Sequence, residues 1–159
     1  MPCCDFSLHS DEGLSPEIRA MKGVYLLYLK IEELVDAEDL EDPLPQNARH
    51  MLLLLESPKR MGDLARDMLS QPSTVTALAD KLEELGLVAR RRDPSDRRAW
   101  LLELTEAGRA EHAETVSYAA ELFRSVSGLD DDEIKVFATL MTKVRTTIEK
   151  SGLPKGPKA

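Results

Sequence analysis

The chain has 159 residues, of which 42% are hydrophobic and 31% charged, and its formal net charge is −8. This composition is typical of a soluble, helix-rich protein, and the length suits one domain with helical extensions. No run approaches the roughly 20 apolar residues that a membrane span needs. Residues 1–12 carry three acids and no Lys or Arg, which argues against a signal peptide, so we expect a cytoplasmic protein with no membrane partner.

The N-terminal part predicts a tail followed by a long apolar helix. Residues 1–14 lack periodicity, and they hold the only cysteines, Cys3 and Cys4. For this pair we prefer reduced thiols on a flexible tail, and thiol or peroxide sensing stays open as an alternative. Residues 15–35 follow a helical period but are apolar over more than one face, which indicates burial on several sides. A partner subunit is the simplest cover in so short a chain.

The central part predicts a winged helix-turn-helix. Three predicted helices come first, and Gly86 ends the third of them. Two predicted strands follow, and the turn-forming segment between them is Asp93-Pro94-Ser95-Asp96-Arg97-Arg98. The last of these helices has the core face Val75, Leu78, Ala79, Leu82 and Leu85. The expected helices are residues 46–56, 61–68 and 72–85, and the expected strands are residues 87–92 and 99–104.

The C-terminal part predicts two further helices. Thr105 is positioned to cap a helix of about 20 residues, and Asp130 with Glu133 suggests a capping pattern for the last helix, which ends near Lys150. The fold class is therefore mostly α with a small β-hairpin wing. The expected segments are a tail (1–14), an N-terminal dimerisation helix and connection (15–42), a winged DNA-binding lobe (43–104), C-terminal dimerisation helices (105–150) and a tail (151–159).

Basic charge gathers in the winged segment. Residues 58–98 have a local net charge of +2, while the remainder has −10, and distribution matters more than the sum for a nucleic-acid partner. The exposed face of the helix at 72–85 offers small hydroxyl groups that can approach a duplex closely, with Lys81 further along. An arginine at the hairpin tip can enter a narrow minor groove. Asp96 is then interpreted as a brace for an Arg side chain.

These residues resemble the MarR family (multiple antibiotic resistance regulators). The resemblance rests on the stretch from Leu64 to Gly108, and the flanking helices extend it in number and order to residues 15–150. The specific blocks are Arg91-Arg92-Asp93-Pro94-Ser95-Asp96-Arg97-Arg98 and Leu104-Thr105-Glu106-Ala107-Gly108. Weaker blocks are Leu64-Ala65-Arg66, Ser73-Thr74-Val75-Thr76 and Leu82-Glu83-Glu84-Leu85-Gly86-Leu87-Val88.

The resemblance implies a triangular homodimer with intertwined terminal helices, which acts as a transcriptional regulator, preferentially a repressor. It would bind a pseudo-palindromic operator with half-sites about 10–10.5 bp apart, or a multiple of that distance. Arg98 takes the position of the wing arginine that enters the minor groove, and Asp96 that of its acidic partner. The remaining DNA-facing positions fall on Ser73, Thr74, Thr76, Ala77, Arg91 and Arg97.

Family members commonly respond to small phenolic or other aromatic anions, which bind between the dimerisation helices and the winged lobe. The sequence offers candidates for such a cleft, although core packing is the simpler interpretation of each Tyr and Met. They are Tyr25, Tyr28, His50, Met51, Arg60 and Tyr118.

Other functions remain as alternatives. The chain has no nucleophile beside a base, no Gly-rich phosphate loop and no metal-ligand spacing, so we expect neither an enzyme nor a cofactor or metal. His112 beside Glu111 and Glu114 is a thin zinc candidate. The negative net charge keeps open a winged-helix interaction module that does not bind DNA.

Overall fold

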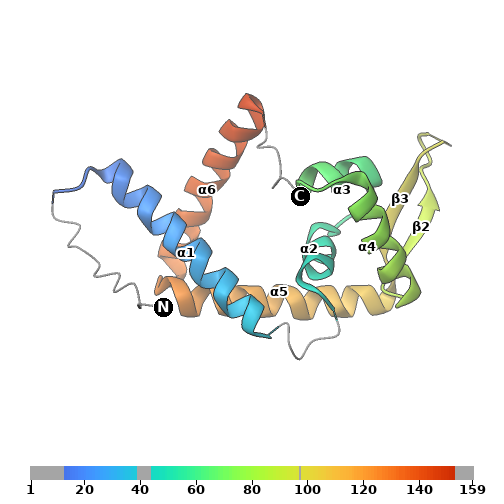
Figure 1. The fold of residues 1–159 in the computed structure, drawn as a ribbon, viewed down its shortest axis with the longest axis horizontal. Helices are drawn as coiled ribbons and strands as arrows, with labels where there is room; N and C mark the ends of the chain where they lie inside the picture. Colours follow the sequence, from blue (N-terminus) through green and yellow to red (C-terminus); the bar gives the residue numbers. More distant parts are fainter. Residues whose placement is uncertain (1–12, 39–43, 97, 153–159) are drawn as a thin grey trace, which may run out of the picture.

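The computed structural model describes residues 13–38, 44–96 and 98–152, and it shows a mostly helical chain with a small antiparallel sheet (Figure 1). This confirms the predicted fold class. No helix in these ranges has the length and apolar character needed to cross a membrane. In chain order the elements are α1 (Pro16–Glu38), α2 (Gln46–Leu54), β1 (Lys59–Arg60), α3 (Met61–Asp67), α4 (Pro72–Glu84), β2 (Val88–Arg92), β3 (Trp100–Leu104), α5 (Glu106–Ser127) and α6 (Asp131–Ser151).

The buried hydrophobic core belongs to one lobe. Every buried hydrophobic side chain of the described residues lies between Leu44 and Leu102, from α2, α3, α4, the sheet and the adjoining turns. The predicted core face of α4 is buried except at Leu85, which is 52% exposed. The reason is that α4 ends at Glu84, and the chain then turns at Gly86, whose φ is +71°.

The sheet has the order β1-β3-β2, with all pairs antiparallel. The hairpin of β2 and β3 was predicted, and its strands begin one residue later than expected. Strand β1 was not predicted, because two residues are too short for an alternating pattern. It exists through pairing with β3, where Lys59 lies opposite Leu102 and Arg60 opposite Leu101.

A close backbone contact joins this lobe to α5. Thr105 caps α5 as predicted, since its Oγ accepts the N–H of Gly108 at 3.0 Å. The same hydroxyl donates to the carbonyl of Gly86 at 2.6 Å, and the Thr105 N–H donates to the carbonyl of Leu87 at 3.0 Å. A Cβ on Gly108 would lie 1.8 Å from the Leu87 carbonyl oxygen, so only glycine fits here.

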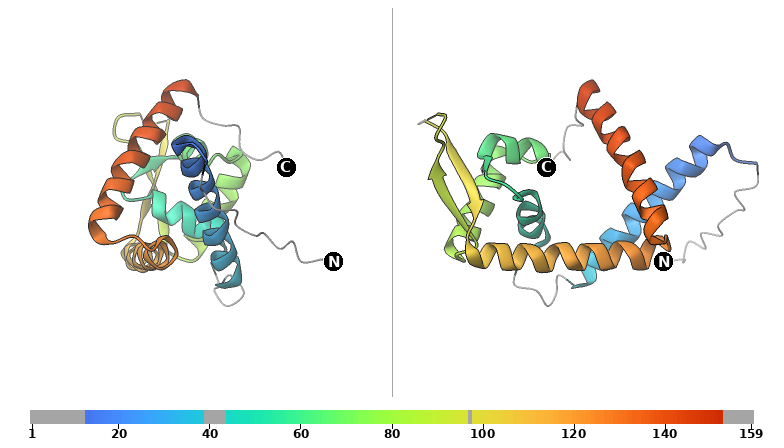
Figure 2. Two further views of the ribbon diagram at one scale, coloured as in Figure 1. Left: turned by 90° about the vertical axis from the view of Figure 1, so that its left-hand side faces the viewer. Right: turned by 180° about the vertical axis from the view of Figure 1, so that it is seen from behind.

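Outside the lobe, α1 and α6 expose their apolar faces. Helix α5 runs away from the lobe, α6 leaves from its far end, and α1 crosses it between that end and the lobe (Figures 1 and 2). Helix α6 has no buried residue, although Asp130 and Glu133 form the expected capping box. Val136 of α6 is 60% exposed and Tyr25 of α1 is 61% exposed. Large apolar residues along both helices are therefore left uncovered by the rest of the described chain.

We expect Gly108→Ala to lower the free energy of unfolding by about 3 kcal/mol or more, because the new methyl group would force the backbones of α5 and Leu87 apart. Chemical denaturation followed by circular dichroism measures this. The matched control is Gly62→Ala in α3, where a Cβ meets nothing within 4 Å. It should be neutral or stabilising by up to about 1 kcal/mol, since alanine favours helices. Equal stability of the two variants would contradict the account of this joint.

Candidate nucleic-acid interface

The surface of α4 opposite its core face carries small polar side chains. Ser73, Thr74, Thr76 and Ala77 are exposed; the first two precede the buried Val75, and the other two lie between Val75 and Leu78. Thr76 Oγ donates to the carbonyl of Pro72 at 2.8 Å, and in the described part of the chain the hydroxyls of Ser73 and Thr74 have no partner. Small side chains with unused donors allow close approach of a phosphate or a base edge.

Lys81 extends this surface one turn further. Its side chain is exposed, and it forms no ion pair with any residue that the structure describes. It follows Ala77 by four residues, so the two lie on the same side of the helix. The five predicted positions of α4 therefore form one continuous exposed strip.

The base of the hairpin tip is held by a buried carboxylate, Asp93. Its Oδ2 accepts from Arg60 Nε at 2.8 Å and from Arg60 Nη2 at 2.6 Å. Its Oδ1 accepts from the backbone N–H of Ser95 at 2.8 Å and from the Ser95 hydroxyl at 2.6 Å. These hydrogen bonds from Ser95, reinforced by the pairing with Arg60, lower the pKa of Asp93 from 3.8 to about 2.

This network differs from the prediction in two ways. Arg60 was expected to line a ligand cleft, but it lies on β1 and braces the hairpin tip. Asp96 was expected to hold an Arg side chain, but its Oδ1 accepts the backbone N–H of Arg98 at 3.0 Å, and its Oδ2 only approaches Arg60 Nη1 at 4.0 Å. The Asp-Pro-Ser sequence could have indicated the turn at Asp93, whereas no local pattern points to a partner 33 residues away.

Three consecutive arginines of β2 each contact another side chain of the lobe. Arg90 reaches α4, and Arg91 forms an ion pair with Glu103 of β3. The guanidinium of Arg92 lies over the ring of Trp100, 4.1 Å from its centroid. The charge of Arg91, one of the predicted phosphate contacts, is thus already balanced by a neighbouring carboxylate.

Arg98 differs from these three. Its guanidinium has no hydrogen bond or ion pair with any residue that the structure describes, and it is exposed next to the turn that Asp93 and Asp96 hold in place. Arg97 lies outside the described residues. A rigid turn that presents an unpaired guanidinium is suited to entering a narrow groove of negative potential.

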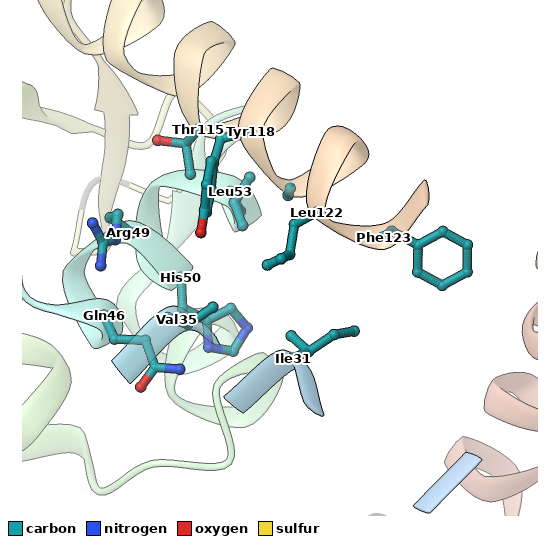
Figure 3. Close-up of a pocket in the computed structure, with 11 residues that line it drawn as sticks. Ile31, Val35, Gln46, Arg49, His50, Leu53, Thr115, Tyr118, Leu122 and Phe123 are labelled. Atoms are coloured by element: carbon teal, nitrogen blue, oxygen red, sulfur yellow. The ribbon is translucent and has the colours of Figure 1, made fainter. Parts of the chain in front are cut away.

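A cavity of about 300 Å³ lies where the lobe meets α1 and α5. His50, from α2, and Tyr118, from α5, both line it, together with the apolar side chains of Ile31 and Leu122 (Figure 3). Partial burial lowers the pKa of His50 below its usual 6.5, which favours the neutral ring at pH 7. The full lining is Ile31, Val35, Gln46, Arg49, His50, Leu53, Thr115, Tyr118, Ala119, Leu122 and Phe123.

The other predicted cleft residues lie elsewhere. Met51 is fully buried in the lobe core, because it faces away from the cavity on α2. Tyr25 and Tyr28 are exposed on α1 and do not line the cavity, and the Tyr28 hydroxyl donates to Glu32. Of the six candidates, the structure therefore brings only His50 and Tyr118 together at this cavity.

Metal and thiol candidates gain no support from the geometry. In the described ranges no three His, Cys, Asp or Glu side chains are placed to hold a metal ion, and this includes His112 with Glu111 and Glu114. Cys3 and Cys4 lie outside those ranges.

Sequence comparisons identify regulators of transcription as relatives. The model of the MarR family matches residues 51–100. The chain is 33% identical to the HTH-type transcriptional repressor MdtR of Bacillus subtilis (strain 168), over 66% of this chain and 74% of that protein. It is 31% identical to the HTH-type transcriptional regulator YkoM of the same organism, over 58% of this chain and 60% of YkoM.

Solved structures show the same fold. The transcriptional regulator BldR from Sulfolobus solfataricus superposes with a TM-score of 0.64 at 26% identity, covering 86% of this chain and 96% of BldR. A mutant of MepR from S. aureus bound to an oligodeoxyribonucleotide superposes with a TM-score of 0.52 at 21% identity, covering 79% of this chain and 94% of MepR. These relatives are transcriptional regulators and not enzymes.

We expect Asp93→Asn to lower Tm at neutral pH, because the ion pair to Arg60 is lost. Since folding lowers the pKa of Asp93 from 3.8 to about 2, its stabilisation is complete above the higher value and disappears as pH falls through the lower one. The Tm difference between wild type and variant should therefore be constant above about pH 5 and shrink between about pH 4 and pH 2.

Thermal denaturation at a series of pH values measures this difference. Asp96→Asn is the matched control, and it should lower Tm less, because Asp96 only approaches Arg60 at 4.0 Å. An Asp93→Asn effect of the same size at pH 3 and pH 7 would contradict the assigned pairing.

Proposed function

This chain belongs to the MarR family, and from that premise we propose that it is a transcriptional repressor that binds a pseudo-palindromic DNA operator as a homodimer. Helix α4 would enter the major groove, and the hairpin of β2 and β3 would reach the adjacent minor groove. The observation that carries the proposal is the exposed guanidinium of Arg98, which has no partner among the described residues and lies beside a turn braced by Asp93. The repressor assignment follows MdtR, the related transcriptional repressor of Bacillus subtilis.

The homodimer is supported by the exposed apolar faces of α1 and α6. Met21 and Val136 are 69% and 60% exposed, and neither helix adds a buried side chain to the core in the described part of the chain. Contiguous apolar surface of this kind marks an interaction site. A second copy would cover it and set two α4 helices against successive turns of one duplex, about 10–10.5 bp apart or a multiple of that distance.

An effector site is supported by the cavity between α1, α2 and α5. Its volume of about 300 Å³ suits a small aromatic ring. Apolar walls would take the ring, while Arg49, His50 and Tyr118 would meet a carboxylate or phenol group. Because the cavity lies where the lobe joins α5, we propose that a bound phenolic or aromatic anion changes the lobe orientation and releases DNA.

We expect Arg98→Ala to weaken binding to an operator selected from a random DNA pool by about tenfold, and to lower the slope of log K against log salt by about 0.9, the value for one lost phosphate contact. Fluorescence anisotropy across a salt series measures both. Lys135→Ala, which removes one positive charge from α6, should leave both values near those of wild type. Unchanged affinity and slope for Arg98→Ala would refute the wing assignment.

We expect Val144→Asp to weaken self-association by about 100-fold or more, because it would bury an unpaired carboxylate in the apolar face of α6. Sedimentation velocity at several concentrations measures the dimer constant. Thr139→Asp places the same charge on the opposite side of α6 and should leave the dimer intact. A Val144→Asp protein that remains fully dimeric would exclude this face from the interface.

We expect 4-hydroxybenzoate to raise the Tm of the wild-type protein and to weaken its binding to the operator. Ala119→Phe should abolish both effects by filling the cavity, while the Tm without ligand falls only slightly. Benzoate and phenol would show whether the carboxylate or the hydroxyl is required. A ligand-induced shift that persists in Ala119→Phe would place the effector at another site.

A further inference from the structure

The C-terminal half of α4 carries a charge that is unfavourable for DNA binding. It holds Asp80, Glu83 and Glu84 against a single cation, Lys81. Asp80 follows Thr76 by four residues, so it lies on the side of the helix that is proposed to face DNA. Unbalanced carboxylates at this position would repel the phosphates of a duplex.

Arg90 pairs with two of these carboxylates and offsets one of their two negative charges. Its Nη1 lies 2.6 Å from Glu83 Oε2, and its Nη2 lies 2.5 Å from Asp80 Oδ1. Its backbone N–H also points to Glu83 Oε1 at 3.3 Å. One guanidinium thus spans two carboxylates on adjacent turns of α4, which is the forked geometry that arginine provides and lysine does not.

The position of Arg90 is fixed by the core. In the sheet Arg90 lies opposite Leu102, which is fully buried. The Arg90 side chain is itself only 26% exposed, so it is poorly placed to reach a phosphate. The neighbouring Arg91 and Arg92 contact Glu103 and Trp100 within the hairpin, whereas Arg90 crosses from the hairpin to α4.

We propose that Arg90 is a positioning residue for DNA binding, which acts by pairing with Asp80 and Glu83 on α4, so that one of their two negative charges is offset, and does not itself contact DNA. The inference rests on the proposed DNA-binding function. It assigns Arg90 a role different from that of Arg98, since one balances charge inside the protein and the other meets the nucleic acid.

The test compares variants on the operator selected from a random pool, across a salt series. Arg90→Ala should weaken binding about tenfold at low salt, because both carboxylates then face the phosphates without a partner, and this loss should shrink as salt rises because the repulsion is screened. Adding Asp80→Asn and Glu83→Gln to Arg90→Ala should restore affinity to within about threefold of wild type. Circular dichroism and the emission of Trp100, the one tryptophan of the chain, verify that the lobe is folded.

Two further variants complete the test. Arg90→Lys keeps the charge and should lose less affinity than Arg90→Ala, which also covers the case in which the alanine variant does not fold. Arg145→Ala removes an exposed arginine from α6 and should bind within about twofold of wild type.

Two results would overturn the inference. One is Arg90→Ala binding as wild type at low salt, and the other is a triple variant as weak as the single one. In each case wild-type binding would leave the proposed function intact. A wild-type protein that binds no duplex would instead refute the proposed function itself.

Discussion

The contact between Gly108 and the Leu87 carbonyl fixes the relation between the two halves of the molecule. Helix α5 can approach the lobe this closely because residue 108 has no side chain, and Thr105 holds the approach with hydrogen bonds in both directions. Since α5 continues to α1 and α6, this joint sets the placement of the DNA-facing surface relative to the helices that are proposed to pair. The effector cavity lies along the same helix, so any movement of α5 would reach both sites.

The arginines of the lobe have two different roles. Arg60, Arg90 and Arg91 are each matched to carboxylates within the lobe, and they set the shape of the hairpin and the charge of α4. The Arg98 guanidinium, in contrast, has no partner within residues 13–38, 44–96 and 98–152. The net negative charge of the chain is therefore compatible with a DNA-binding surface, because the local balance at the hairpin tip and along α4 governs what a phosphate meets.

The sequence predicted most of the elements because their determinants are local. Helical periodicity, Gly86 and the caps at Thr105 and Asp130 each act within a few residues, and the structure has helices and strands at nearly the expected positions. The errors arose where a contact joins distant segments. Strand β1 and the pairing of Arg60 with Asp93 both depend on β3 lying beside β1. No local sequence pattern indicates that these two distant segments are neighbours. Met51 could equally have faced a cavity or the core from its place on an apolar helix, and only the packing of α2 decides.

The concentration of buried side chains between Leu44 and Leu102 has a consequence for biosynthesis. The buried side chains of this central segment pack against one another, whereas in the proposed homodimer the apolar faces of α1 and α6 would be covered only when a second subunit binds. An unmatched subunit would present these faces to chaperones and proteases. The cellular abundance of the regulator would then depend on the rate at which subunits associate. At a low subunit concentration association is slow, so a larger share of the subunits would be degraded.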